Sequence, residues 1–312
     1  MHAQAIVFEN PKSLALSALA LPAMGEADVE VQVEFTGISA GTERLLWDGT
    51  MPQFPGMGYP LVPGYETVGR VVKAGAAASL AVGTRVYVPG SQCFDGVRNL
   101  FGGSASALVV PSTRAMAIKE SLAEQGVLFA LAATAYHAHS AAGTQQPDLI
   151  VGHGVLGRMV ARLAVVAGAQ PVVWETNPAR RTGAQGYEVI DPITDTRRNY
   201  QCICEVSGAG HLLNELIGRL APGGEVVLAG FYDEPLSFVF PPAFMREARI
   251  RVAAQWAPKD LADVIALAAD GRLSLDGLIT HQQDATQADA AYRTAFGDAD
   301  CLKMVLDWRH TQ

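Results

Sequence analysis

The 312-residue sequence predicts an α/β protein, in which a barrel-like domain of β-strands is followed by a domain with a doubly wound parallel sheet. Three observations predict this fold class. Short apolar runs interrupted by glycine and proline fill the first third of the chain, and strand-like and helix-length segments alternate from Leu149 onward. An apolar content of 49% is also sufficient for a large buried core.

The first third predicts β-strands at residues 3–8, 29–35, 68–72, 85–88 and 107–110. Such short runs, each bounded by turn residues, are typical of a barrel-like β domain. The alanine-rich stretch 121–142 lacks proline and has helical spacing, so it predicts a helix that connects to the next domain.

The second domain begins with a predicted strand at 149–151, which is followed by a glycine turn and a helix-length apolar stretch at 156–167. The alternation continues and indicates parallel strands joined by crossover helices. We expect further strands at 171–174, 189–190, 202–206, 225–229 and 250–254, and helices at 212–220 and 261–269. A segment at 278–281 and a strand at 304–306 are expected to return to the first domain. The predicted domains are therefore 1–125 with 273–312, and 126–272.

Composition excludes several classes of function. The net charge of −8 and the pI near 5.4 provide no basic surface, so we expect no nucleic-acid partner. No targeting segment and no apolar run of membrane-spanning length is evident, which predicts a cytoplasmic protein without a transmembrane segment. Four cysteines without a C-x-x-C pair argue against a disulfide framework.

The glycines Gly152, Gly154 and Gly157 form a G-x-G-x-x-G turn between the predicted strand and helix. The first permits a sharp turn, the second lets backbone N–H groups approach a pyrophosphate, and the third allows the helix to pack against the strand. The helix amino terminus then faces the phosphate anions. Glu175 ends the next strand and is placed to accept hydrogen bonds from ribose hydroxyls.

The negative charge of Glu175 favours NAD over NADP, although Arg180 and Arg181 lie close enough in sequence to hold the extra phosphate of NADP. A structural turn without a nucleotide is the alternative interpretation. We expect His153 to be a solvent-facing turn residue. The predicted cofactor-binding set is Gly152, His153, Gly154, Val155, Leu156, Gly157 and Glu175.

Several motifs resemble the medium-chain dehydrogenase/reductase superfamily over nearly the whole chain. They are the segments 37–43, 63–66, 69–72, 83–86, 102–103 and 221–224, together with the glycine turn. The resemblance implies a GroES-like catalytic domain and a Rossmann domain, with the active site in the cleft between them. It also implies a homodimer formed through the edge of the Rossmann sheet.

Longer stretches resemble one family within this superfamily, the bacteriochlorophyllide dehydrogenases of purple phototrophic bacteria. They are 41–47, 59–66, 151–158, 174–178 and 238–248. This resemblance implies an NAD-dependent secondary-alcohol dehydrogenase that oxidises the hydroxyethyl group of bacteriochlorophyllide a to an acetyl group in bacteriochlorophyll biosynthesis.

The zinc ligands of the superfamily are missing from the matching positions. Ser39 or Ala40 stands at the first, Tyr65 at the second, and residues 131–136 contain neither cysteine nor acid at the third. Hydroxyls do not replace thiolate and imidazole as zinc ligands, so we expect no metal. A rearranged site drawn from Glu66, Cys93, His137 or His139 is the alternative.

The catalytic candidates are Thr42, Tyr65, Ser39 and Glu66. Thr42 matches the relay hydroxyl of the superfamily, and the hydroxyl of Thr42, Tyr65 or Ser39 is expected to relay the alcohol proton. Glu66 and Glu43 are expected to hold backbone or arginine partners rather than to act as bases.

A macrocyclic substrate needs a broad apolar cleft, for which we name Trp47, Phe54, Tyr59 and Phe231, with packing as the equal alternative for each. Two other functions compete with the dehydrogenase. One is a zinc-free quinone or enoyl reductase, a class that usually prefers NADPH. The other is an NAD(H)-binding protein without catalysis.

Overall fold

The computed structural model describes residues 1–53, 55–140, 145–253 and 255–311. The chain divides into two compact units, with unit 1 comprising Met1–Ala130 and Leu275–Gln312 and unit 2 comprising Leu131–Ser274. The domain boundaries expected from sequence lie within five residues of these divisions, at 125/126 and 272/273. None of the helices in the described ranges is long and apolar enough to cross a membrane.

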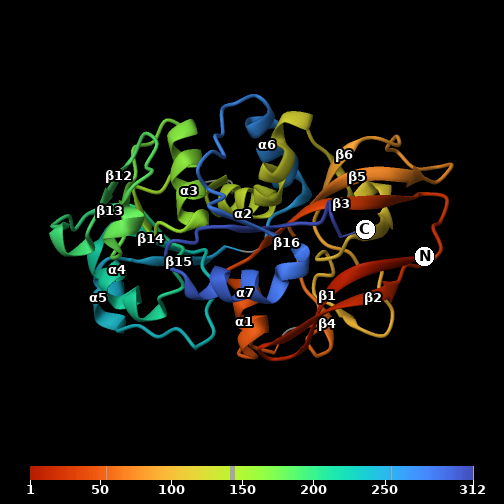
Figure 1. Cartoon of the computed structure of the whole chain (residues 1–312). Helices are drawn as coiled ribbons and strands as arrows, with labels where there is room; N and C mark the ends of the chain where they lie inside the picture. Colours follow the sequence, from red (N-terminus) through yellow and green to blue (C-terminus); the bar gives the residue numbers. More distant parts are fainter. Residues whose placement is uncertain (54, 141–144, 254, 312) are drawn as a thin grey trace. The chain divides into compact units, whose positions relative to one another are not determined.

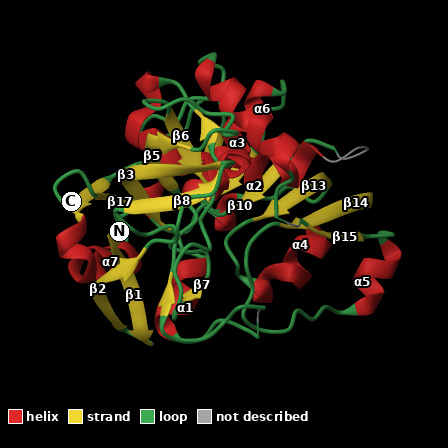
Figure 2. Cartoon of the chain, turned by 90° about the vertical axis from the view of Figure 1, so that its right-hand side faces the viewer, coloured by secondary structure: helices red, strands yellow, loops and turns green. Residues whose placement is uncertain are grey.

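Unit 1 contains two sheets (Figure 2). The larger has the order β16 (His281–Asp284), β17 (Met304–Asp307), β3 (Asp28–Ile38), β5 (Thr67–Ala74), β6 (Arg85–Val88) and β9 (Met116–Ala117), and β8 (Ala107–Pro111) also pairs with β3. The smaller has the order β2 (Ser13–Ala20), β1 (His2–Asn10), β4 (Leu61–Val62) and β7 (Arg98–Asn99).

The core of unit 1 follows from the alternation along β3, in which Val29, Val31 and Val33 are buried and the residues between them are less so. Helix α7 (Ala288–Gly297) contacts β2 of the smaller sheet and β16 and β17 of the larger, and so lies between them. The short helix α1 (Thr42–Asp48) follows directly after β3. Strand β3 therefore carries the chain from the middle of the larger sheet into the segment of the catalytic candidates.

Unit 2 contains a six-stranded parallel sheet with the order β12 (Glu188–Ile190), β11 (Val172–Trp174), β10 (Leu149–Val151), β13 (Tyr200–Glu205), β14 (Leu220–Leu228) and β15 (Arg249–Val252). From β10, the strands follow in chain order toward each edge of the sheet, β11 and β12 on one side and β13, β14 and β15 on the other. Helix α3 (Val155–Val166) lies on one face, and α4 (Leu213–Arg219) and α5 (Phe240–Met245) lie on the other (Figure 1). The carboxyl end of β10 is thus the switch point at which such sheets bind ligands.

The structure confirms the predicted fold class and most of the predicted strands. The short strands β4, β7, β9 and β16 and the longer β2 were not predicted. The predicted helix at 121–142 is a 3-10 segment, Glu120–Leu128, followed by α2 (Phe129–Ser140), with a break at Ala123 where φ is 36°. Residues 141 and 142 lie outside the described ranges. Helix α6 (Pro258–Ala269) forms where expected.

Candidate active site

The glycine turn of unit 2 requires glycine at two positions and leaves open space at a third. Gly152 has a φ of +106°, which side chains rarely adopt. A Cβ on Gly157 would lie 1.9 Å from the carbonyl oxygen of Gly152, so α3 can pack this closely only without a side chain. A Cβ on Gly154 would meet no atom within 4 Å, which leaves the turn open for a ligand.

The amino terminus of α3 provides donors for an anion at that opening. Gly154 is the N-cap residue and supplies no side-chain hydrogen bond to the first turn, which begins with Val155 and Leu156. The first N–H groups of a helix have no partner within the helix, and its dipole favours negative charge there. The open space and these donors fit the pyrophosphate of a dinucleotide.

His153 is buried, which contradicts the expectation of a solvent-facing turn residue. Its exposed fraction is 0%, its Nδ1 is 2.6 Å from the carbonyl oxygen of Arg180, and its Nε2 is 2.9 Å from the Tyr187 hydroxyl. Burial and the nearby Arg158 lower the pKa of the imidazole to about 4. The imidazole is therefore neutral and supports the glycine turn from within the protein. Arg180 and Tyr187, which follow β11, hold it by hydrogen bonds.

Glu175 lies at the carboxyl end of β11 beside the turn and is half-buried. Its Oε2 accepts a hydrogen bond from the backbone N–H of His153 at 3.2 Å, and its Oε1 accepts one from the N–H of Asn177 at 2.8 Å. A carboxylate has about four lone-pair sites, so both oxygens can still accept ribose hydroxyls. The backbone contacts fix the carboxylate in place for that role.

Arg181 does not compete for the same role, because its guanidinium already has partners. It donates to the carbonyl oxygens of Glu175 and Thr176 at 2.8 and 2.9 Å and forms an ion pair with Asp191 at 2.6 Å. The carbonyl of Arg180 faces His153 and Arg158. Arg181 therefore stabilises the loop after β11.

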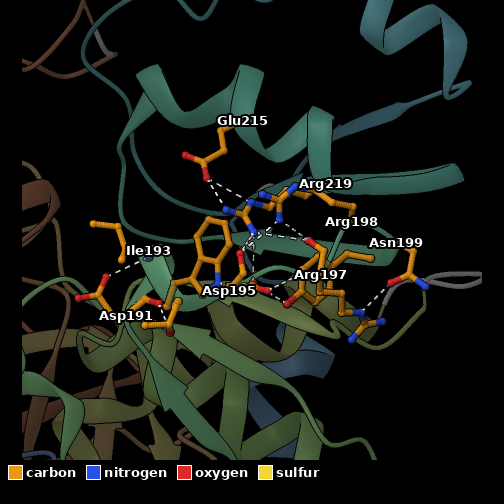
Figure 3. Close-up of polar contacts among 11 residues, drawn as sticks. Asp191, Ile193, Asp195, Arg197, Arg198, Asn199, Glu215 and Arg219 are labelled. Atoms are coloured by element: carbon orange, nitrogen blue, oxygen red, sulfur yellow. Dashed lines mark hydrogen bonds and ion pairs between the residues drawn. The ribbon is translucent and has the colours of Figure 1, made fainter.

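A polar network around Asp195 (Figure 3) fixes the position of Trp174 at the carboxyl end of β11. Asp195 Oδ2 accepts hydrogen bonds from Trp174 Nε1 at 2.8 Å and from the Tyr200 hydroxyl at 2.7 Å. Arg219 donates to the Asp195 carbonyl at 2.8 Å, and its guanidinium lies 4.4 Å from the centre of the Trp174 ring. Since Trp174 directly precedes Glu175, this network also positions that carboxylate.

In unit 1 the structure brings three of the predicted catalytic hydroxyls together. The Tyr65 hydroxyl donates to Ser39 Oγ at 2.6 Å, and the Thr42 side chain lies close enough to lower the pKa of the same phenol. Ser39 follows β3, Thr42 begins α1, and Tyr65 lies two residues before β5, so neighbouring strands place them at one edge of the sheet. Burial and the carboxyl of Glu66 raise the pKa of Tyr65 well above 10, so the phenol is neutral.

Glu66 forms a buried ion pair with Lys303, and not with the backbone or arginine partner that we expected. Lys303 Nζ lies 2.9 and 2.7 Å from the two carboxylate oxygens and 3.1 Å from the carbonyl oxygen of Ile38. Strand β3 separates the two residues, and a Cβ on Gly37 would lie 2.1 Å from Glu66 Oε2. With both oxygens engaged, Glu66 is suited to positioning its neighbours.

Glu43 is also fully buried, and neither of its partners is a cation. Its Oε2 accepts a hydrogen bond from the Tyr292 hydroxyl at 2.9 Å, and its Oε1 lies 3.4 Å from the backbone nitrogen of Ser39. Burial and the nearby Glu66 raise the pKa of Glu43 to about 8. Sequence reasoning missed Lys303 and Tyr292; a single lysine within the apolar run before Trp308 was the one available signal.

The rearranged metal site that we left open has no support in the part of the chain that the structure describes. No group of three His, Cys, Asp or Glu side chains there could hold a metal ion. Glu66 is engaged by Lys303, and His137 Nδ1 is 2.7 Å from Asp260 Oδ2. Cys93 is buried, with its sulfur 3.3 Å from Ser91 Oγ.

The four pocket candidates have different surroundings. Trp47 is only 5% exposed and stacks on Tyr292 at 6.0 Å, so it is a packing residue. Tyr59 donates to the Leu46 carbonyl and lines a hollow of about 420 Å³ with Pro60, Gly96, Val97 and Arg98. Phe231 in unit 2 is 43% exposed. Phe54 lies outside the described residues.

Comparisons with known proteins place this chain among dehydrogenases. Residues 25–120 match the family described as alcohol dehydrogenase GroES-like domain. A curated protein of Rhodobacter capsulatus, 2-desacetyl-2-hydroxyethyl bacteriochlorophyllide A dehydrogenase, is 52% identical over 311 residues, with 99% of each chain covered.

Two solved structures share the fold over nearly the whole chain. An alcohol dehydrogenase of Escherichia coli CFT073, complexed with NADH, has a TM-score of 0.83 at 23% identity and covers 98% of this chain and 99% of its own. A putative zinc-binding dehydrogenase of Sinorhizobium meliloti 1021, bound to NADP, has a TM-score of 0.82 at 22% identity with the same coverage.

Proposed function

Since the chain belongs to the family of 2-desacetyl-2-hydroxyethyl bacteriochlorophyllide A dehydrogenases within the alcohol dehydrogenases, we propose that it oxidises the hydroxyethyl group of bacteriochlorophyllide a to an acetyl group. We further propose that NAD accepts the hydride and that no catalytic zinc takes part. The observation that supports this substrate is the 52% identity over the full length of the chain.

The geometry of unit 2 supports NAD as the cofactor. The open space at Gly154 and the uncapped first turn of α3 would hold the pyrophosphate, and Glu175 would accept the ribose hydroxyls. The added phosphate of NADP would meet the negative charge of Glu175, while Arg181 is engaged by Asp191. When bound, the nicotinamide ring supplies the hydride acceptor.

The hydroxyls of unit 1 support removal of the alcohol proton without a metal. Ser39 or Ala40 stands at the first position where zinc relatives carry ligands, and Tyr65 at the second. Ser39 and Tyr65 are hydrogen-bonded to each other. Thr42 is half-buried and lies near the Tyr65 phenol. The carbinol carbon of the substrate adjoins a conjugated macrocycle, which stabilises positive character there, so less polarisation by the protein is needed.

The edge of the sheet in unit 2 supports a homodimer. Strand β15 pairs only with β14 among the described strands, and Ile250 and Val252 on it are exposed. Phe244 and Met245 of the neighbouring helix α5 are 66% and 74% exposed. An unpaired edge with apolar side chains is a surface that a second copy of the chain would cover.

The test is to incubate the purified protein with hydroxyethyl bacteriochlorophyllide a and either NAD or NADP, and to follow the absorption shift to the acetyl product together with NADH formation. We expect turnover with NAD and little with NADP. Metal analysis of the active sample, and activity after treatment with a chelator, test the zinc-free proposal. A cofactor-loaded protein without any absorption shift would contradict the proposed reaction.

Variants test the proton path within the same assay. We expect Tyr65→Phe and Thr42→Val to lower kcat by about 10²-fold or more, because general acid–base groups contribute at this scale. Thr50→Val removes an exposed threonine hydroxyl just after α1 and serves as the matched control with normal turnover. Wild-type turnover in both Tyr65→Phe and Thr42→Val would exclude these hydroxyls from the path.

A further inference from the structure

Arg98 is an exposed arginine at the edge of the smaller sheet of unit 1, where it begins β7. Among the described residues its guanidinium has no hydrogen-bond or ion-pair partner. Each of the other arginines of this unit holds a carboxylate or a backbone carbonyl: Arg44, Arg70, Arg85, Arg114, Arg293 and Arg309. In a chain with a net charge of −8, the guanidinium of Arg98 is therefore left available for an anion from outside the protein.

The side chain of Arg98 belongs to a hollow in the surface of unit 1. This hollow has a volume of about 420 Å³ and is lined by Tyr59, Pro60, Gly96, Val97 and Arg98. Its two walls are joined, because the backbone N–H of Arg98 donates to the carbonyl oxygen of Pro60 at 2.8 Å. The stem of Arg98 lies beside Gly58, where a Cβ would be 3.5 Å from Nε and 3.7 Å from Cγ.

The walls of the hollow are largely apolar. The side chains of Tyr59 and Val97 are half-buried and pack against the core of unit 1, so each keeps part of its apolar surface toward solvent. Apolar walls with a single well-placed charged group are typical of sites for small molecules. The hollow thus fits a ligand that has an apolar body and one negative charge.

Two contacts connect the hollow with the catalytic hydroxyls of the same unit. On one side, the Tyr59 hydroxyl donates to the carbonyl oxygen of Leu46, which lies about 6 Å along α1 from the first residue of that helix. On the other side, the ring of Phe101 packs edge-on against Tyr65, with 5.2 Å between ring centres. Phe101 follows Arg98 by three residues, a span of about 10 Å at most. The hollow and the hydroxyls are therefore neighbours.

The substrate of the proposed function carries a suitable anion. A bacteriochlorophyllide is a free acid, because its propionate side chain ends in a carboxylate, whereas the same group is esterified with a long alcohol in bacteriochlorophyll. The hydroxyethyl and propionate groups stand on neighbouring rings of the macrocycle. We propose that Arg98 binds the propionate carboxylate in the hollow while the hydroxyethyl group lies at Ser39 and Tyr65. This inference rests on the proposed function and adds the residue that selects the free acid.

The chemistry of the two groups determines which kinetic constant should change. A guanidinium presents a planar pair of N–H donors that matches the two oxygens of a carboxylate. The carboxylate takes no part in hydride transfer, so Arg98 holds it equally in the ground state and in the transition state. Binding of this kind lowers KM and leaves kcat unchanged.

The test compares hydroxyethyl bacteriochlorophyllide a with its propionate methyl ester, which has the same macrocycle without the charge. We expect the wild type to show a KM at least tenfold higher for the ester at a similar kcat, since hydrogen bonds to charged groups contribute at this scale. Arg98→Gln should raise the KM of the acid by the same factor and leave that of the ester unchanged. Arg98→Lys keeps the charge without the planar pair of donors and should lie between the two.

The matched control is Arg293→Gln, which removes the same charge from an exposed side chain that is already paired with Asp289. It should keep the wild-type ratio of the two KM values. Salt provides a second control, because an exposed ion pair is screened at high ionic strength. Added salt should raise the KM of the acid in the wild type and should leave that of Arg98→Gln unchanged.

A wild type with equal KM values for acid and ester would overturn the inference, and so would an Arg98→Gln variant that still discriminates between them. Affinities of both pigments, measured by quenching of tryptophan fluorescence, do not depend on turnover. A wild type that binds the acid more tightly than the ester through Arg98 but oxidises neither would contradict the proposed reaction alone. A wild type that oxidises both equally well would contradict the role of Arg98 alone.

Discussion

Replacing Gly154 by alanine should weaken cofactor binding without harming the fold. Gly154 has φ −73° and ψ −171°, which alanine adopts without strain, and its added Cβ would meet no protein atom within 4 Å. Reduced freedom of the unfolded chain should stabilise such a variant by about 0.4–1 kcal/mol. The methyl group would stand where the pyrophosphate approaches the N–H groups, so we expect at least a tenfold weaker Kd for NAD, or about 1.4 kcal/mol.

Gly157→Ala is the matched comparison, because we expect it to lower the stability of the fold, whereas Gly154→Ala lowers the affinity for NAD. Its Cβ would lie 1.9 Å from the carbonyl oxygen of Gly152 and 3.2 Å from Val206 Cγ2, so α3 must move away from the turn. Overpacking of this sort costs about 1–3 kcal/mol, which lowers the Tm by roughly 3–9 °C in a domain of this size.

Calorimetric titration with NAD and thermal unfolding measured on the same preparations check both variants. We expect the two losses to separate, with affinity lost in Gly154→Ala at an unchanged or higher Tm, and stability lost in Gly157→Ala. A Gly154→Ala protein that binds NAD as tightly as the wild type would refute this prediction. In that case the open space above the turn is not the pyrophosphate site.

Three further predictions concern buried charge and cofactor choice. Lys303→Met leaves Glu66 unpaired and should cost about 3–5 kcal/mol in urea unfolding, whereas Lys73→Met at the surface should cost less than about 1 kcal/mol; equal losses would contradict the buried ion pair. His153 stabilises the fold in its neutral form, so stability is present above pH 6.5 and is lost as the pH falls through about 4, by up to about 3 kcal/mol. His153→Gln should flatten this acid dependence, and an unchanged unfolding profile would refute it. Glu175→Ala should lower the NAD over NADP preference measured by kcat/KM, and an unaltered ratio would remove Glu175 from cofactor selection.

The parts predicted well from sequence are those that local pattern determines. The strand at 149–151, the glycine turn and the helix that follows form one continuous segment, so spacing and apolar periodicity are sufficient to predict them. The structure also brings together Ser39, Thr42 and Tyr65, which were proposed from motifs in two separate segments.

The parts that could not be predicted depend on contacts between distant segments. Glu66 meets Lys303 across 237 residues and Glu43 meets Tyr292 across 249, and no local pattern indicates either pairing. His153 was expected at the surface because turn residues usually are, but the segment after β11 folds over it with Arg180 and Tyr187. Trp47 is a core residue for a similar reason, since α7 from the end of the chain covers it.

The charge balance of the buried carboxyls provides a further test of the zinc-free proposal. A divalent cation bound beside Ser39 and Tyr65 would favour the ionised form of Glu43 and would lower its pKa. The raised pKa of Glu43 is therefore a property of a cluster in which Lys303 alone balances the two carboxyls. We expect Glu43 to keep its raised pKa when excess Zn²⁺ is added, as measured by the infrared band of its protonated carboxyl, with no stoichiometric metal retained after gel filtration. If that pKa fell while one zinc was bound per chain, a metal would be the native counter-charge and the zinc-free proposal would be wrong.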